Sequence, residues 1–214
     1  MTNTPAELRE QAMSSGLSLR DAANTPVELF QAWFEQTGPA EVPQPRAMTL
    51  ATANAQGRPS ARMVILAGFD QRGFDFATDA RSPKIADAAQ QRWVALVFYW
   101  AQLERQVRVE GQLEALDEAT SDRYFYARSR ESQVATWLAR QSDVIEGRDI
   151  LEESLLRRLA EFEGQPIPRP PYYLAYRVKP ATVEFWQARI DRINDRLRYT
   201  PAQGGSWIIE LLAP

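Results

Sequence analysis

The sequence contains no cysteine and no histidine in its 214 residues. The missing thiols exclude disulfides, a CxxC redox pair, a cysteine nucleophile and a thiolate zinc site. The missing imidazoles exclude a Ser-His-Asp triad, an HExxH metalloprotease helix and a His-ligated haem. We therefore expect no metal site. An enzyme of this composition must rely on Lys, Arg, Tyr, carboxylates or a bound organic cofactor.

Lysine is also scarce: Lys84 and Lys179 are the only lysines among the 25 basic residues, and the others are arginines. In a chain this rich in arginine, a single arginine is weak evidence of function. The 28 acidic residues bring the net charge to −3, which favours neither a nucleic-acid nor a membrane partner. No apolar run approaches the roughly 18 residues of a membrane span, and the first residues lack the apolar segment of a signal peptide. We expect a cytoplasmic protein.

The remaining composition, 44% hydrophobic and 25% charged, is typical of a globular protein. Residues 1–25 are polar, and Ser14 to Leu17 interrupts any helix, so we expect a flexible N-terminal arm. Residues 26–214 are expected to form a single domain. Its first helix should begin at Pro26, with Thr25 as the N-cap, and end before Gly38.

The hydrophobic period changes to 2 after residue 47, which is typical of strands. Strands are expected at 48–53, 58–67, 74–78, 93–100 and 106–113, with one short helix at 82–90. Loops this short exclude a parallel sheet and favour an antiparallel sheet or barrel. Helices are predicted at 117–127, 131–140 and 149–163, and further strands at 172–178, 182–186, around 197–199 and at 207–211. This order indicates an α+β fold whose last strands complete the first sheet.

An anion site is suggested by Arg62 and by the segment that begins the helix at 82–90. Arg62 lies in an otherwise apolar strand, where a charge is costly unless it is paired. Ser82 is a candidate N-cap and Lys84 lies in the first turn, where a cation opposes the helix dipole unless both share an anion. Together with Thr78, these residues could form a phosphate cradle. The alternative is an Arg62–carboxylate pair and an ordinary surface lysine.

Polar groups suited to a heterocyclic ligand follow further along the chain. Gln106 begins a strand, and the pairs Ser132-Gln133 and Gln141-Ser142 flank a helix that carries Trp137. Their donors and acceptors match a ring of alternating nitrogen and carbonyl groups, although helix caps and surface positions use the same residues.

A cluster of arginines follows Glu184-Phe185-Trp186-Gln187, at positions 189, 192, 196 and 198. This spacing predicts a positively charged wall facing an anionic ligand. The arginine-rich composition of the whole chain is the alternative explanation.

In this order, these segments resemble the pyridoxamine-5′-phosphate oxidase family of flavin enzymes, from about Leu8 to Pro214. The most specific matching pieces are Leu103-Glu104-Arg105-Gln106-Val107, Arg128 with Ser132-Gln133, Gln141-Ser142, and Glu184-Phe185-Trp186-Gln187. The resemblance implies a homodimeric, antiparallel split β-barrel with helices around it and FMN bound between the subunits. It also implies an oxidase, in which a small anionic substrate gives hydride to the flavin and dioxygen reoxidises the flavin.

The resemblance assigns roles to individual residues. Arg62 and Lys84 would neutralise the FMN phosphate, with Thr78 and Ser82 as neutral donors. Arg196 would stabilise the reduced flavin near its N1/C2 edge. The other implied cofactor contacts are Met63, Val64, Ile65, Leu66, Ala67, Ala77, Gln106, Gln141, Ser142 and Trp186, and the implied substrate contacts are Arg9, Tyr124, Arg128, Ser132, Arg192 and Asn194.

The sequence departs from the family pattern mainly on the substrate side. Ala67 replaces a lysine, Ala12 a tyrosine and Asn194 the histidine of Arg-Leu-His-Asp-Arg, while Pro83 replaces an arginine beside Lys84. Each polar partner lost from a buried pocket costs about 1–3 kcal/mol of binding, so efficient oxidation of pyridoxamine phosphate is not expected. A larger cationic pocket suits a bulkier anion, as in the phenazine-pathway oxidases of this family.

We therefore expect oxidation of a reduced phenazine carboxylate, an expectation that rests on family analogy and the altered pocket. The alternatives are an ordinary pyridoxine/pyridoxamine 5′-phosphate oxidase and a non-catalytic flavin-binding carrier or sensor.

Overall fold

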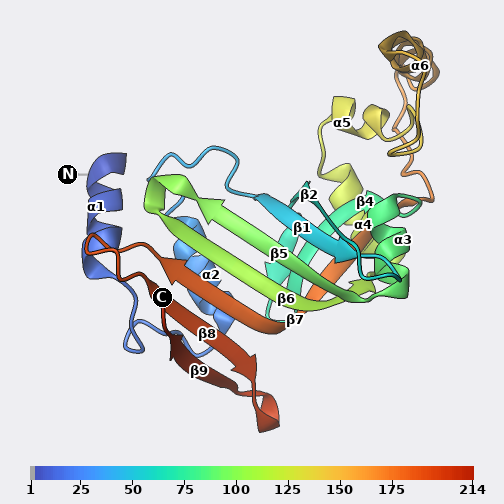
Figure 1. Ribbon diagram of the computed structural model, residues 1–214. Helices are drawn as coiled ribbons and strands as arrows, with labels where there is room; N and C mark the ends of the chain where they lie inside the picture. The colour runs from blue at the N-terminus through green and yellow to red at the C-terminus, as the bar shows by residue number, and fades with distance from the viewer. Residues whose placement is uncertain (1–2) are drawn as a thin grey trace.

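The computed structural model describes residues 3–214 and contains one curled sheet with helices at both ends (Figure 1). Within these residues, nine strands pair antiparallel throughout, in the order β2-β1-β5-β6-β7-β4-β3, with β8 on β7 and β9 on β8. The strands are β1 Ala47–Ala53, β2 Pro59–Ile65, β3 Gly68–Asp70, β4 Gly73–Asp79, β5 Trp93–Trp100, β6 Arg105–Ala115, β7 Tyr173–Gln187, β8 Asp195–Pro201 and β9 Trp207–Leu212. The predicted antiparallel α+β fold is confirmed.

In sequence order, and within the described residues, two helices precede β1, one lies between β4 and β5, and three lie between β6 and β7. They are α1 Pro5–Ser15, α2 Pro26–Glu35, α3 Pro83–Gln90, α4 Glu118–Tyr126, α5 Arg130–Ala135 and α6 Arg148–Glu161, with short 3₁₀ turns at η1 Ala101–Leu103 and η2 Gln203–Gly205. Among the described residues, no helix is long and apolar enough to cross a membrane.

The sheet curls around α2, which supplies the centre of the core. Phe30 is fully buried and packs edge-on against Phe74 of β4 and Phe98 of β5, with ring centroids 4.9 and 5.0 Å away. These two strands are not neighbours in the sheet, so one helix can contact both only if the sheet bends towards itself. Helix α2 begins as predicted, because Thr25 and Glu28 form a capping box ahead of Pro26.

Two predicted strands, 172–178 and 182–186, are in fact the single strand β7. Pro180 in its middle lacks an N–H, which would normally end a strand within a sheet. Here the register between β6 and β7 shifts at Glu110/Gly111, and this bulge accommodates the proline. Gly111 packs so closely on the Lys179 carbonyl that a Cβ would overlap it. The bulge lets two long strands bend as one pair.

Part of the expected N-terminal arm is helical, and helix α1 ends within the Ser14–Leu17 segment that was expected to interrupt a helix. Thr4 and Glu7 make a capping box, and the helix continues to Ser15, one residue before Gly16. The Leu17 side chain is buried in the core, and its N–H donates to Asp195 at 2.8 Å. Helix α1 therefore packs at the β6–β8 end of the sheet (Figure 1).

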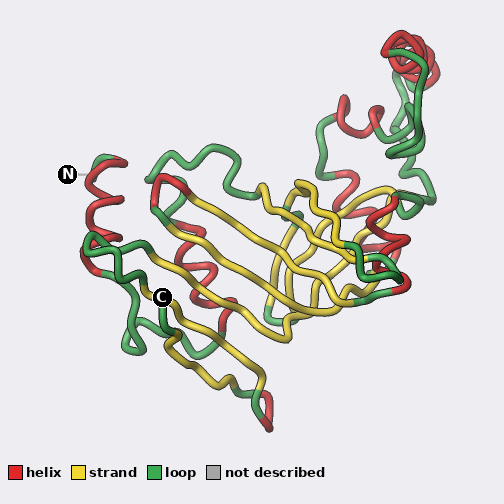
Figure 2. The backbone as a smooth tube through the Cα atoms, viewed as in Figure 1, coloured by secondary structure: helices red, strands yellow, loops and turns green. Residues whose placement is uncertain are grey.

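The helix expected at 131–140 is shorter, because α5 ends at Ala135. The Thr136 hydroxyl donates to the Gln133 carbonyl, which competes with continuation of the helix. Trp137 consequently lies after the helix. Helices α5 and α6 extend away from the sheet at the end opposite α1, joined by long loops (Figures 1 and 2).

Candidate functional site

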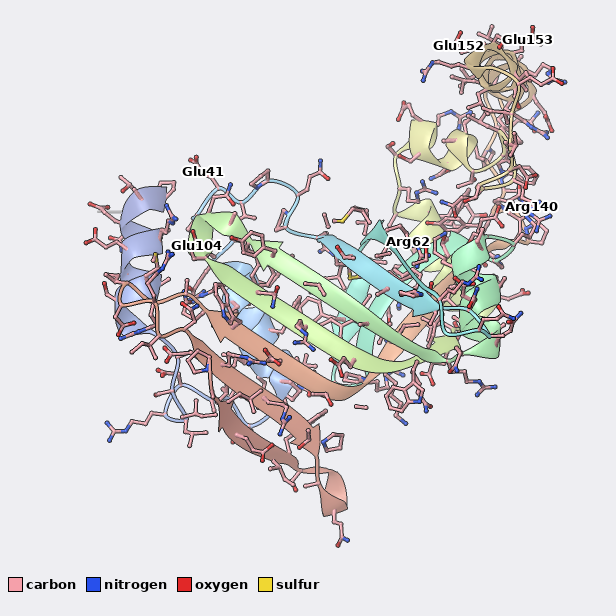
Figure 3. The ribbon with its side chains drawn as sticks, viewed as in Figure 1. Glu41, Arg62, Glu104, Arg140, Glu152 and Glu153 are labelled. Carbon is pink, nitrogen blue, oxygen red and sulfur yellow. The ribbon has the colours of Figure 1, made fainter. Side chains whose placement is uncertain are left out.

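A cleft of about 1170 Å³ opens between β2, the end of β4, the start of α3 and the α4–α5 segment. It brings together most of the predicted site residues from the first half of the chain and from the helical block. These are Arg62, Met63, Val64, Ile65, Leu66, Ala67, Ala77, Thr78, Lys84, Tyr124, Arg128, Ser132, Gln141 and Ser142. Figure 3 shows Arg62 and Arg140 at this end of the molecule.

Lys84 is the most informative residue in the cleft, since it is a buried cation whose partners are all neutral. Its Nζ donates to Gln141 Oε1 at 2.8 Å, Ser82 Oγ at 2.9 Å and Thr78 Oγ1 at 3.2 Å. Burial and the nearby Arg62 lower the pKa of Lys84 to about 8. Ser82 begins α3 as predicted, but its hydroxyl contacts Lys84 and makes no cap hydrogen bond.

Arg62 is held in the same way by neutral oxygens. Its guanidinium donates to Thr52 Oγ1 and Ser60 Oγ, both at 2.8 Å, and to the Leu50 carbonyl at 3.2 Å. Burial lowers the pKa of Arg62. The Thr52 hydroxyl in turn donates to Asp87, so Thr52 lies between the Arg62 guanidinium and this carboxylate.

Neither Arg62 nor Lys84 forms an ion pair with a carboxylate of residues 3–214, so the alternative of an Arg62–carboxylate pair is wrong. Two adjacent, partly desolvated cations are costly on their own. An anion bound between them would remove that cost, and hydroxyl and amide groups are already in place around it. The donor set fits a phosphate group.

The substrate-side predictions Tyr124, Arg128 and Ser132 lie along the same cleft. The Arg128 guanidinium stacks over the Tyr173 ring at 5.0 Å, and its buried Nη1 has no hydrogen-bond partner within residues 3–214. Buried donors without partners are rare in proteins. Arg128 therefore presents an unsatisfied positive donor, which suits a second anionic group.

The remaining predicted cofactor residues lie at the other end of the sheet. Gln106, Trp186 and Arg196 are direct cross-strand partners on β6, β7 and β8, so they form one row. Glu104, two residues before this row begins, lies far from Arg62 in Figure 3. The Arg196 guanidinium is held by Glu184 at 3.0 Å and by the Ala213 carbonyl at 2.9 Å.

Arg9, Arg192 and Asn194 also lie at this second end. Arg9 forms an ion pair with Glu104. Asn194 accepts from the Arg189 N–H at 3.1 Å, and Arg192 has a left-handed backbone with φ of 68°. One chain therefore carries the predicted site as two separate groups, the cleft and the Gln106–Trp186–Arg196 row with its neighbours.

The predicted positively charged wall after β7 is largely neutralised within the chain. Three of its four arginines are paired with carboxylates, Arg189 with Asp195, Arg196 with Glu184 and Arg198 with Glu210, and Arg192 forms no ion pair within residues 3–214. The carboxylate partners come from three segments, two of which follow or precede the arginines by more than ten residues. The number of arginines in this segment therefore did not predict its net charge, because two of the three neutralising carboxylates lie elsewhere in the chain.

Sequence reasoning missed several residues that shape the cleft. Arg46 and Asp79 line it, and Asp75 supports it from below by bonding Tyr124. The sequence could have pointed to Asp75, because an acidic residue between Phe74 and Phe76 in a strand is unusual. Asp79 accepts from the Gln141 N–H at 3.3 Å and binds Arg81 at 2.7 Å, which holds the segment carrying Gln141 beside Lys84.

A curled antiparallel sheet with a cationic cleft at its edge defines a split-barrel protein with a site for a phosphorylated ligand. Two family models match the chain: "Pyridoxamine 5′-phosphate oxidase" over residues 35–187 and "Pyridoxine 5′-phosphate oxidase C-terminal dimerisation region" over residues 173–214. The chain belongs to the pyridoxamine 5′-phosphate oxidase family.

Similar proteins span essentially the whole chain. Pyridoxine/pyridoxamine 5′-phosphate oxidase of Acaryochloris marina is 47% identical over 209 residues, which cover 98% of this chain and 95% of that protein. The Nostoc punctiforme protein of the same name is 44% identical, with all of both chains covered. The structure of PhzG from Burkholderia lata, in complex with tetrahydrophenazine-1-carboxylic acid, is 31% identical with a TM-score of 0.87, covering 94% of this chain and 100% of that one.

Proposed function

We propose that the protein is an FMN-dependent oxidase that takes hydride from a small anionic substrate and passes the electrons to dioxygen. The observation that carries this proposal is Lys84, a buried ammonium beside Arg62 with no carboxylate partner among residues 3–214. The phosphate of FMN is a dianion near neutral pH and would balance both charges. Membership of the pyridoxamine 5′-phosphate oxidase family supports the same cofactor.

The bound flavin would supply the redox chemistry, by accepting hydride and reacting with dioxygen. The chain's own residues would hold and orient it. Arg62 and Lys84 would bind the phosphate, with Thr78 and Ser82 as neutral donors, and the backbone of residues 63–67 would border the ring. The apolar side chains on this wall include Met63 and Ile65, which are exposed in the single chain, and in the complete site they would keep water from the reacting face.

The separation of the two residue groups supports a homodimer. The Lys84 partner Thr78 pairs with Leu174 near the start of β7, whereas Gln106 and Arg196 pair with Trp186 near its end. A flavin in the cleft would therefore meet this row on a second copy of the chain. The matching C-terminal region, residues 173–214, is described as a dimerisation region, and it contains Trp186 and Arg196. We propose that each flavin site combines the cleft of one subunit with the row of its partner.

We propose a reduced phenazine carboxylate as the substrate. Ala67 lines the cleft without a polar side chain, and Asn194 stands where the family pattern has histidine, so the pocket offers more space and fewer polar contacts. Aromatisation of the reduced ring system provides driving force without an acid–base residue. The similarity to PhzG, whose structure contains tetrahydrophenazine-1-carboxylic acid, favours the same class of substrate.

The second candidate is oxidation of pyridoxine or pyridoxamine 5′-phosphate. It is favoured by the curated relatives of that name, which are 43–47% identical along the chain. It is also favoured by Tyr124, Arg128 and Ser132, which remain in the cleft where the family pattern places substrate contacts.

One set of measurements separates these functions. The purified protein should show flavin absorbance and release FMN on denaturation, and oxygen consumption should then be recorded with tetrahydrophenazine-1-carboxylate and with pyridoxamine 5′-phosphate. Turnover of the phenazine at least tenfold above that of the vitamer supports the proposal. The reverse ratio selects the second candidate. A flavoprotein that neither substrate bleaches anaerobically is a carrier or sensor, and a colourless protein that ignores added FMN refutes the cofactor assignment.

A further inference from the structure

We propose that Arg46 is a substrate-binding residue, which contacts the anionic oxygen group of the substrate, a carboxylate or a phosphate, at the Ala67 end of the cleft. The proposal deepens the function given above and rests on it. Arg46 lines the cleft together with Leu66 and Ala67. It belongs to no segment that the sequence patterns pointed to, since it lies in a proline-rich loop just before β1.

The backbone around Arg46 is held firmly. The Leu66 N–H donates to the Arg46 carbonyl at 2.8 Å, which extends the β1–β2 pairing by one residue. One residue earlier, the indole N–H of Trp100 donates to the Pro45 carbonyl at 3.1 Å, and Trp100 is 1% exposed. The side chain therefore starts from a fixed point, which lowers the entropy lost when a ligand binds.

The Arg46 side chain is aimed along the cleft wall by contacts that leave most of its donors free. Nη1 donates to the Leu66 carbonyl at 3.2 Å and to the Ala67 carbonyl at 3.5 Å, and the guanidinium carbon lies 5.5 Å from the centre of the Phe34 ring. Nε and Nη2 donate to no protein atom among residues 3–214, and no carboxylate there pairs with Arg46. An arginine held on carbonyls with a free edge is suited to an oxyanion.

Other groups suited to an anion lie at the same end. Ala67 donates its N–H to the Asp75 carbonyl, and the Asp75 carboxylate accepts from the Tyr124 hydroxyl at 2.7 Å. Gly68 lies so close to that hydroxyl that a Cβ would overlap it, so Tyr124 is next to residues 67–68. Arg128, with its unsatisfied Nη1, lies just past the end of α4, the helix that carries Tyr124. Asp75 itself is neutralised by Arg177.

Arg46 is well separated from the phosphate cradle. In the β1–β2 ladder, Arg62 pairs with Leu50, and Arg46 lies opposite Leu66, one residue beyond the last pair. At about 3.3 Å per residue, the two levels are about 13 Å apart along the strand. The cleft thus has one cationic end for the cofactor phosphate and a second, around Ala67, for another anion. Arg46 supplies a positive charge on the cleft wall beside Ala67, whose own side chain is uncharged.

The test compares Arg46→Met with Arg157→Met, which removes an exposed arginine from α6 outside the cleft. FMN affinity is measured first, by quenching of flavin fluorescence. Steady-state kinetics then use tetrahydrophenazine-1-carboxylate and pyridoxamine 5′-phosphate. Binding of inorganic phosphate and of oxidised phenazine-1-carboxylate is followed by the shift of the flavin spectrum.

We expect Arg46→Met to keep wild-type FMN affinity and kcat but to raise the KM of the substrate about 10- to 100-fold, with Arg157→Met unchanged. If Arg46→Met weakens the binding of phosphate but not of phenazine-1-carboxylate, the subsite binds phosphate. If it weakens the binding of phenazine-1-carboxylate, the subsite binds a carboxylate. Adding Ala67→Lys to Arg46→Met should recover part of the lost affinity, because it returns a cation to the same wall. An unchanged KM for both substrates together with unchanged anion binding overturns the proposal. Failure to bind FMN in the unsubstituted protein instead refutes the proposed function.

Discussion

The hydroxyl of Tyr124 donates a hydrogen bond of 2.7 Å to Asp75, a residue that is only 1% exposed. Asp75 also accepts two hydrogen bonds from Arg177, at 2.6 and 2.8 Å. A residue on the substrate side of the cleft is thus connected directly to a buried ion pair between β4 and β7. The position of Tyr124 depends on that pair, and on the space left by Gly68.

Replacing Asp75 with asparagine should therefore destabilise the protein strongly. The substitution leaves the buried Arg177 charge without its main partner, which costs about 3–5 kcal/mol. Tyr124→Phe removes one hydrogen bond and keeps the ion pair, so it should cost about 1 kcal/mol. Urea unfolding of both variants gives the comparison. Equal losses of unfolding free energy would contradict a stabilising role of the ion pair.

FMN affinity should fall as the pH rises through about 8. The free protein's Lys84 has a pKa lowered to about 8, so above this pH it is increasingly a neutral amine that binds a phosphate dianion poorly. The loss should approach tenfold per pH unit between pH 8 and 9.5. Fluorescence titrations at constant ionic strength measure it.

Two variants serve as controls for this pH dependence. Lys84→Met should bind FMN about 10- to 100-fold more weakly at pH 7 and show a flat profile. Arg62→Met should bind as weakly but keep a pH dependence, because its lysine remains. A wild-type slope in Lys84→Met would exclude Lys84 as the titrating group, and wild-type affinity in both variants would refute the phosphate cradle.

Two variants, each impaired in one of the two residue groups, should complement each other if the site is shared between subunits and the FMN concentration is too low to fill the Lys84→Met site. Lys84→Met damages the cleft, and Arg196→Met damages the row on β6 to β8. Unfolding and refolding the two proteins together should yield mixed dimers with one intact site each, and about a quarter of the wild-type activity for random pairing. Each variant refolded alone is the control. No recovered activity, with mixed dimers demonstrated by differently tagged chains, would place both residues in the same subunit's site.

Restoring polar groups in the pocket should shift substrate preference. Ala67→Lys together with Asn194→His should raise kcat/KM for pyridoxamine 5′-phosphate by about tenfold or more, since each buried charge-assisted contact contributes about 1.5–3 kcal/mol. The same change should reduce turnover of a bulky phenazine carboxylate by filling its space. Parallel kinetics with both substrates check the ratio, and an unaltered ratio would show that these positions do not set specificity.

Much of the fold was readable from local patterns. The Thr25-Pro26 helix start and the short apolar run of β5 are local features, so sequence alone predicted both elements. The continuity of β7 was not predictable, because Pro180 is accommodated by a bulge in a different strand. Helix α1 was missed because its capping box was outweighed by its weakly amphipathic composition.

The candidate site likewise contains residues that the sequence could indicate and residues that it could not. Lys84 and Arg62 were found because each breaks a local rule, a cation at a helix N-terminus and a charge in an apolar strand. Arg46 breaks no local rule, and only the three-dimensional pairing with Leu66 brings it into the cleft. The carboxylate partners of Arg196 and Arg198 lie on other strands, so residue spacing could not reveal that those charges are neutralised.

Strand β7 has a consequence for which sequence changes this protein can accept. Its first half carries Tyr173, which lines the cleft, and its second half carries Trp186 in the row at the other end. An inserted or deleted residue between them would rotate one of these side chains to the opposite face of the sheet. Length variation among relatives should therefore be absent from β7 and concentrated in the β8–β9 turn, where Gly204 and Gly205 have open space around them.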